Sequence, residues 1–453
     1  MTKKTKDSLE YSGKNITSLE FPENIRTRPT MYIGTVDNQG VHTLLREVLD
    51  NSCDEAGQGF GKEISVAVCY GNNTITVIDG GRGIPHEINK KHNLSTVEVS
   101  VSVMHASGKF DSAAYATGKG GLNGIGLKAV NALSSTFEVQ SYRDGKVLRA
   151  EYKKGKPVAI VNEDCESDTG TVFVFSPDPE IFTEAEYLVP EYEELAGVLE
   201  SKAYLLPGVT FNLVSEDEDG KVLKQEAFLS KNGLTDYVDV LIGDDKYISN
   251  NVCFDGIIDV KATVAGAEDT QIHIDVAMGY QKGYDLADTH GFTNGIYQSE
   301  GGTHITGFKS GLTKIMTDYI AKAGLLKGKD AKLKLDGTDF LESLVAVISI
   351  KHDAPLFKGQ DKQKVSNTDI PGAVRKLFND KFDHFINSNP KIAKKIADKA
   401  IAAARGRVAS LRAKETIRKS NDGIFSMNSA SKLTPCKSKN PEECEIFICE
   451  GRA

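Results

Sequence analysis

The sequence predicts an α+β protein with more than one domain, and three observations lead to this fold class. The chain has 453 residues, a length that suits two to four domains of ~100–200 residues each. Hydrophobic residues make up 40% of it and charged residues 26%, which is typical of a folded soluble protein. Strand-like and helix-like patterns alternate along the chain, and this alternation favours α+β or α/β domains over an all-helical protein.

Charge and cysteine content exclude several classes of protein. A net charge of −8 rules out a uniformly basic nucleic-acid coat, so any contact with nucleic acid must be local. No apolar run approaches the ~18 residues of a membrane span, and the opening MTKKTKDSLE lacks the apolar core of a signal peptide. The seven cysteines form no CxxC pair, which argues against a disulfide framework or a zinc ribbon. We therefore expect a cytoplasmic protein with no membrane partner.

The first strong element is a helix over residues 41–56. Its apolar side chains recur at helical spacing on one side, and the opposite face carries Glu47, Asp50, Asn51 and Asp54. The segments 63–70 and 74–79 then alternate with period two around a tight turn, which predicts a β-hairpin. Asp79 thus stands at a strand end, directly before the glycine-rich GGRGIP.

A second glycine cluster, TGKGGLNGIGLKAVNAL (117–133), runs into another helical pattern. Between the two clusters HASGKF (105–110) lies in a stretch rich in small residues that could form a lid. From about 135 to 215 the pattern indicates strands and turns. A second unit starts near 230 with a helix in FLSKNGLTDYVDVLI, followed by the strands IIDVKATVAG, IHIDVAM and LVAVISIKH and the helix ITGFKSGLTKIMTDYIAKAG.

Residues 391–419 predict a long basic helix, with ten Lys and Arg residues against Asp398 and Glu415. Such a charge run usually forms a solvated face, although it is also the surface of this chain best suited to DNA. Beyond it, SNDGIFSMNSASKLTPCKSKNPEE is expected to form a loop.

Two groups of residues point to nucleotide chemistry. Glu47 and Asn51 lie one helical turn apart and share a face, so a carboxylate that polarises water and an amide oxygen that ligates Mg²⁺ can enter one site. Spacing alone leaves open that both side chains are simply solvated. Asp79 can accept a hydrogen bond from an adenine amino group, or it can simply form the turn before the glycines.

The second glycine cluster suits phosphate binding, because its backbone amides can approach phosphate oxygens before a helix N-terminus. It is not a Walker loop, since no GxxxxGK[ST] occurs, and no strand leads directly into it as a Rossmann site requires. A glycine-rich surface loop remains the alternative. The residues concerned are Gly118, Gly120, Gly121, Gly124 and Gly126.

The order of these pieces, continued by Thr169-Gly170-Thr171, resembles the ATPase domain shared by gyrase B, Hsp90, histidine kinases and MutL. RTRPTMYIG (26–34), EVLDNSCDEA (47–56), HASGKF, EGGTH (300–304) and QDK (360–362) are similar to the B subunits of bacterial type II topoisomerases, as in gyrase and topoisomerase IV. The resemblance runs from about residue 11 to the last strand. It implies an N-terminal exchange arm (1–20), a GHKL ATPase α/β sandwich (21–228), a ribosomal-S5-like transducer domain that includes the long basic helix (229–420), and a linker with the start of a Toprim domain (421–453).

The resemblance also implies roles for individual residues. Glu47 matches the general base for the attacking water, Asn51 the Mg²⁺ ligand, and Asp79 the adenine-binding aspartate, helped through water by Thr171. Gln360 and Lys362 match a transducer loop that reaches the γ-phosphate, where positive charge helps as negative charge develops.

The remaining implied nucleotide contacts surround this centre. They are Arg82, Gly83, Ile84 and Pro85 in the pocket wall, Arg149 at its rim, Tyr115 on adenine, Lys109 with Gly120, Gly121, Leu122, Asn123, Gly124, Ile125 and Gly126 in a phosphate-binding lid, and Tyr11 in an arm that crosses to the partner's nucleotide. The implied cofactors are ATP and Mg²⁺. The implied partners are a second copy of the chain, a topoisomerase A subunit and double-stranded DNA.

The sequence departs from the family pattern at several positions. Asn123 replaces the usual His, Asp361 the usual Thr, and Thr30 a Gly. The first two match positions near the phosphates, so ATP turnover is expected to be slower or differently coupled. FICEGRA aligns with the start of the Toprim motif, with Glu450 matching its glutamate and Arg452 replacing its aspartate. We expect no DNA cleavage by this chain alone. The alternatives are an ATP clamp without topoisomerase partners and a nonhydrolysing regulatory module; EGGTH and the QDKQK loop count against the first.

Overall fold

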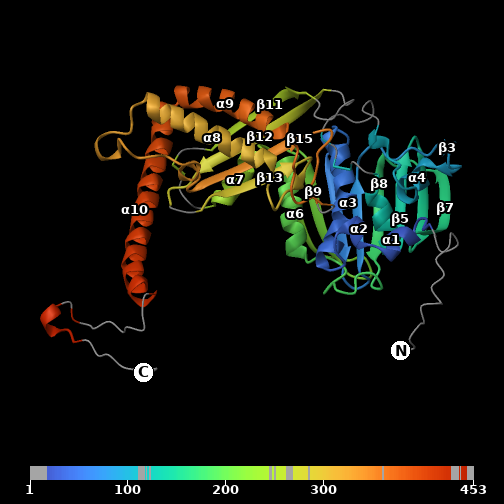
Figure 1. The fold of residues 1–453 in the computed structure, drawn as a ribbon. Helices are drawn as coiled ribbons and strands as arrows, with labels where there is room; N and C mark the ends of the chain where they lie inside the picture. The colour runs from blue at the N-terminus through green and yellow to red at the C-terminus, as the bar shows by residue number, and fades with distance from the viewer. Residues whose placement is uncertain are drawn as a thin grey trace.

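The computed structural model describes two α/β units in series, followed by a long helix (Figure 1). The described residues are 18–110, 118, 120–121, 124–243, 247–248, 251–261, 269–283, 286–359, 362–429, 438 and 440–445. Among the helices in these ranges, none combines the length and the apolar character needed to cross a lipid bilayer.

An eight-stranded sheet organises the first unit, in the order β10-β9-β1-β2-β8-β5-β6-β7. The β1 and β9 strands pair in parallel and every other neighbouring pair in this sheet is antiparallel. The expected hairpin of residues 63–79 is therefore confirmed. The strands are β1 (Glu63–Cys69), β2 (Thr74–Asp79), β5 (Ser134–Arg143), β6 (Lys146–Lys153), β7 (Lys156–Asp164), β8 (Gly170–Pro177), β9 (Thr210–Glu216) and β10 (Val222–Phe228).

Helices cover one face of this sheet, with α3 (Asn38–Gly57) at the centre of the layer (Figure 1). The carboxylate of Asp37 caps α3 by accepting the backbone N–H groups of Gln39 and Gly40. The apolar face of α3, including Leu45 and Leu49, is buried in the core as predicted. The other elements are α1 (Glu23–Thr27), α2 (Thr30–Ile33), α4 (Thr96–Ser102), α5 (Gly126–Leu133), α6 (Tyr192–Leu205), the short helix η3 (Gly108–Phe110) and the small hairpin β3 (Ile88–Asn89) and β4 (Leu94–Ser95).

The helix α6 corrects the prediction of strands and turns across 135–215. Its buried residues recur at helical spacing, so a helix places them all on one face, and this face packs against β9. Prolines lie two residues before and two residues after this helix of 14 residues. Because proline is typical of turns, the segment between them was not predicted to be helical. The buried apolar residues are Tyr192, Leu195, Leu199 and Ala203.

A five-stranded sheet forms the second unit, in the order β11-β12-β15-β13-β14. One face packs on α8 and α9 and the other on α7, which gives two apolar clusters (Figure 1). The elements are α7 (Leu234–Ile242), β11 (Val252–Val260), β12 (Thr270–Tyr280), β13 (Asp288–Thr293), β14 (Ile296–Tyr297), α8 (Thr303–Lys322), η4 (Gly328–Asp330), η5 (Gly337–Phe340), β15 (Leu344–Lys351), α9 (Ile370–Ser388), α10 (Pro390–Ser429) and η6 (Pro441–Glu443).

The predicted basic helix is α10, and it projects away from the second unit (Figure 1). Part of its charge is neutralised within its own unit, because Arg405 pairs with Asp330 and Arg407 with Asp339. The loop predicted from residue 420 is wrong for its first ten residues, since the helical backbone continues to Ser429. A single glycine within that stretch costs only about 1 kcal/mol and does not end a helix.

Candidate active site

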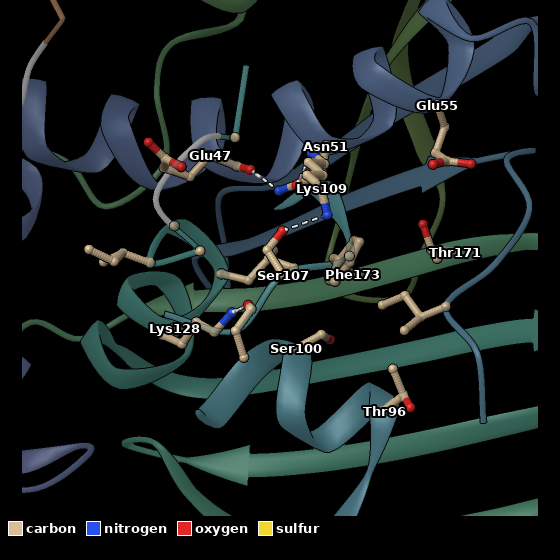
Figure 2. Close-up of a pocket in the computed structure, with 18 of the residues that line it drawn as sticks. Glu47, Asn51, Glu55, Thr96, Ser100, Ser107, Lys109, Lys128, Thr171 and Phe173 are labelled. Carbon is tan, nitrogen blue, oxygen red and sulfur yellow. Dashed lines mark hydrogen bonds between the residues drawn. The ribbon is translucent and has the colours of Figure 1, made fainter. Parts of the chain in front are cut away.

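A pocket opens between α3, the end of β2, α4, the 105–110 segment and the start of α5 (Figure 2). Glu47, Asn51, Asp79 and Thr171 all line it. One residue from the second unit, Lys362, lines it as well. The pocket therefore gathers residues that lie more than 300 positions apart in the sequence.

One end of the pocket is built around Asp79, whose exposed fraction is 7%. Its carboxylate accepts the hydroxyl of Ser52 at 2.8 Å, the backbone N–H of Gly81 at 2.9 Å and the hydroxyl of Thr171. Burial raises the pKa of the Asp79 carboxyl, and these three donors only partly oppose the effect. Thr171 thus contacts Asp79 directly, because β2 and β8 place the two residues opposite each other.

Gly83, Ile84 and Pro85 line the neighbouring wall. Arg82 is not among the lining residues: its guanidinium makes two hydrogen bonds of 2.9 Å to Glu55, which does line the pocket. Arg149 lies on β6 and pairs with Glu138 at 3.2 Å, outside the lining residues.

Glu47 and Asn51, on the acidic face of α3, form the other end of the pocket, so these two side chains are not simply solvated. The amine of Lys109 donates to Asn51 Oδ1 at 2.6 Å and forms an ion pair with Asp54. The Asn51 amide N–H in turn donates to the backbone carbonyl of Glu47. Figure 2 shows Glu47, Asn51 and Lys109 converging on the same side of the pocket.

Lys362 reaches Glu47 from the second unit, with its amine 3.2 Å from Glu47 Oε1. Burial alone would lower the pKa of this amine, but the negative charges of Glu47, Asp50 and Asp54 outweigh burial and raise it. Lys362 therefore stays protonated beside the carboxylate at neutral pH.

The second glycine cluster closes the same end. Gly121, Gly124, Ile125 and Gly126 line the pocket, and the backbone N–H of Gly120 donates to Asp54 at 2.8 Å. A Cβ on Gly126 would lie 1.9 Å from Glu47 Oε2, so only glycine fits at this point without displacing the carboxylate.

Several predicted residues lie outside the described part of the chain. They are Tyr11, Tyr115, Leu122, Asn123, Gln360 and Asp361, together with Glu450 and Arg452. Conversely, Lys128 was not predicted as a site residue, although it is buried, lines the pocket and follows the glycine cluster. Its only signal was a charged residue inside an apolar helical pattern.

This fold and this pocket define an ATP-binding domain of the GHKL type, joined to a second α/β unit. Residues 36–181 match the family of histidine kinase-, DNA gyrase B- and HSP90-like ATPases, and residues 233–416 match the DNA gyrase B family. The chain is 38% identical to the DNA gyrase B protein of Clostridium acetobutylicum over 97% of this chain and 66% of that protein. It is 38% identical to the DNA gyrase B protein of Streptococcus pneumoniae over 100% of this chain and 67% of that protein.

Solved structures of ATP-binding domains are also similar to this chain. The 43K ATPase domain of Thermus thermophilus gyrase B, in complex with an aminocoumarin, has a TM-score of 0.66 and 32% identity, covering 87% of this chain and 97% of that one. The ATP-binding domain of Francisella tularensis topoisomerase IV, in complex with a small-molecule inhibitor, has a TM-score of 0.65 and 27% identity, covering 85% and 97%. The chain belongs to the DNA gyrase B family, and the predicted fold class is confirmed. It spans about two thirds of the length of the curated relatives.

Proposed function

We propose that this chain is the ATPase and transducer portion of the ATP-operated subunit of a type II DNA topoisomerase, and that it binds and hydrolyses ATP. The observation that carries the proposal is the contact of Lys362 with Glu47 at 3.2 Å. It places a cation from the second unit and a carboxylate from α3 in the pocket that also contains Asp79. The names of the relatives support the same role.

Adenine binding is assigned to the Asp79 end. A buried carboxylate that faces an open pocket favours a ligand with an N–H donor, and the adenine amino group is one. Tyr115 and the wall residues Gly83, Ile84 and Pro85 would enclose the base. The positive Arg82 guanidinium acts on the pocket indirectly, because its ion pair orients Glu55, which lines the pocket.

Phosphate binding is assigned to the glycine cluster and Lys109. The backbone amides from Gly120 to Gly126, including those of Leu122 and Asn123, lead into the first residue of α5, whose N-terminus favours negative charge. The Asn51 amide oxygen suits Mg²⁺, because it is a hard oxygen that already accepts a hydrogen bond from an ammonium group. Bound Mg²⁺ would neutralise phosphate charge, and Lys109 would then turn from Asn51 towards the nucleotide.

Glu47 is the proposed general base. Its carboxylate lies at the glycine end of the pocket, where it can accept a proton from a water attacking the terminal phosphate. Lys362, with Gln360 two residues before it in the sequence, would stabilise the negative charge that develops on the leaving phosphates. This cation is present only when the second unit docks on the first.

The wider role follows from that docking. ATP contacts made from both units would favour a closed state, and the Tyr11 arm of a second copy would complete it, giving a homodimer around double-stranded DNA. An A subunit would supply the DNA-cleaving tyrosine, and the cytoplasm is the expected compartment. Relaxation of supercoiled DNA by the full-length protein with a cognate A subunit, in the presence of ATP, would test this role.

The ATPase assignment is tested by Glu47→Gln. We expect phosphate release to fall by about 10²–10⁴-fold, the usual contribution of a general base, while a non-hydrolysable ATP analogue still binds in isothermal titration calorimetry. Glu151→Gln is the matched control, because Glu151 is exposed on β6, and its rate should equal that of the wild type. An undiminished rate in Glu47→Gln would refute the assignment.

A further inference from the structure

Lys128 is a buried lysine of the pocket to which neither the motifs nor the family resemblance gives a role. It is the third residue of α5 and its exposed fraction is 3%. Its amine donates a hydrogen bond of 2.6 Å to the backbone carbonyl of Ala106. In Figure 2 it lies towards the end of the pocket that carries Glu47 and Ser107, away from Thr171.

The charge of Lys128 has no counter-charge in the described part of the chain. No carboxylate there lies within ion-pair distance of its amine, and the charged group that acts on it is Lys109, which has the same sign. Burial, together with Lys109, lowers the pKa of the amine to about 8. The other lysines that contact the acidic face of α3 differ, since Lys202 pairs with Asp50, Lys362 with Glu47 and Lys109 with Asp54.

A buried cation without a partner is costly, and this one lines a cavity rather than packing in the core. An anion in the cavity would therefore be attracted by the full charge of Lys128, whereas the charge of a paired lysine is already neutralised by its carboxylate. An ammonium group has three donors, so Lys128 can keep the Ala106 carbonyl and still donate to a phosphate oxygen. The start of α5, which favours negative charge, is adjacent.

We propose that Lys128 binds the polyphosphate of the nucleotide directly and forms an anion subsite together with Lys109. The inference rests on the proposed ATP-binding function and adds a residue to it. Because Lys128 also holds Ala106, phosphate binding at this amine ties the 105–110 segment, which carries Lys109, to the occupied pocket.

The test is Lys128→Gln, which retains a donor for the Ala106 carbonyl and removes the charge. Isothermal titration calorimetry would compare a non-hydrolysable ATP analogue, ADP and AMP. We expect the analogue to bind at least about tenfold more weakly, as for a lost hydrogen bond to a charged group, with the loss shrinking from the analogue to AMP. Lys153→Gln, the same change at an exposed residue of β6, should bind all three within about twofold of the wild type, as expected for a surface substitution away from the site.

Two results would overturn the inference: wild-type affinity for the analogue in Lys128→Gln, or an equal loss for all three nucleotides, which would indicate a structural role only. Lys128→Ser is measured in parallel, so that the test does not depend on the correct folding of a single variant. If the wild-type chain itself fails to bind the analogue, the ATP-binding proposal is wrong and the assignment of Lys128 falls with it. If the wild-type chain binds the analogue and Lys128→Gln binds it equally well, only the assignment of Lys128 is wrong.

Discussion

The ion pair of Lys202 with Asp50 is expected to hold the two units together. Lys202 lies on α6, and its amine is 2.6 Å from Asp50 Oδ1 on α3. The same amine donates at 2.8 Å to the carbonyl of Gly295, in the turn between β13 and β14 of the second unit. The two side chains are 11% and 12% exposed. Burial alone would lower the pKa of Lys202, but the charge of Asp50 and its hydrogen bond, together with Cys53 and Asp54, outweigh burial and raise it.

Lys202→Met leaves Asp50 buried without a partner and removes the hydrogen bond to Gly295. Removing one member of a buried ion pair costs about 3–5 kcal/mol, so the free energy of unfolding should fall by roughly that amount. Asp50→Asn with Lys202→Met removes both charges. Because a buried pair replaced as a whole is often close to neutral, the double variant should recover most of the loss.

A double-mutant cycle by urea unfolding measures this coupling. Since two units need not unfold in one step, the transitions of both should be followed by fluorescence and circular dichroism together. The matched control is Lys156→Met, which breaks a surface ion pair with Glu23 whose side chains are 69% and 51% exposed; its unfolding midpoint should not move. If the single losses simply add in the double variant, Lys202 and Asp50 are not coupled and the reasoning fails.

Three further predictions concern the pocket. Asp79→Asn should weaken binding of the ATP analogue by about 5- to 150-fold, the value of ~1–3 kcal/mol for a lost buried acceptor; unchanged affinity in calorimetry would remove Asp79 from the adenine site. Gly126→Ala should keep its melting temperature, because Ala favours helix, yet lose about 10²-fold or more in phosphate release, since its Cβ would meet Glu47 Oε2 at 1.9 Å; wild-type turnover would contradict this. In Lys128 the pKa is lowered from 10.5 to about 8, so the unfolded chain binds more protons between those values and the free energy of unfolding rises with pH across that window. Lys128→Met should therefore stabilise the protein by up to about 3 kcal/mol at pH 7 and by less at pH 10, as measured by urea unfolding at both values; an equal gain at the two pH values would speak against a buried charge.

Periodic patterns predicted the parts of the site that lie on single elements. The α3 helix and the β1–β2 hairpin form where the sequence alternates at helical and strand periods, and Asp79 stands at the strand end as expected. Local patterns could not bring Lys362 to Glu47, because the two are 315 positions apart and meet only through the docking of two units. For that contact the order of family motifs was the sole guide in the sequence.

The buried lysines escaped prediction for a physical reason. Lysine is almost never fully buried unless it is paired, so nothing in the sequence indicated that Lys128 and Lys202 are buried. Their burial follows from the positions of neighbouring elements: α5 packs against α3 and α4, and α6 packs near the turn that carries Gly295. The helical period of a sequence identifies which residues share one face of a helix, but it does not identify the element that will pack against that face.

The acidic face of α3 connects the nucleotide site to the second unit. Its three carboxylates stand on successive turns, and each is engaged by a lysine from a different part of the chain: Glu47 by Lys362, Asp50 by Lys202 and Asp54 by Lys109. A bound triphosphate would compete with the first and third carboxylates for their lysines, because its charge is higher and both amines adjoin the pocket. The middle pair does not line that pocket, so it can hold the units in contact while the flanking pairs rearrange. ATP binding would thus shift the docking of the second unit around a fixed point, and the free energy for this shift would come from contacts that the nucleotide makes only in the rearranged state.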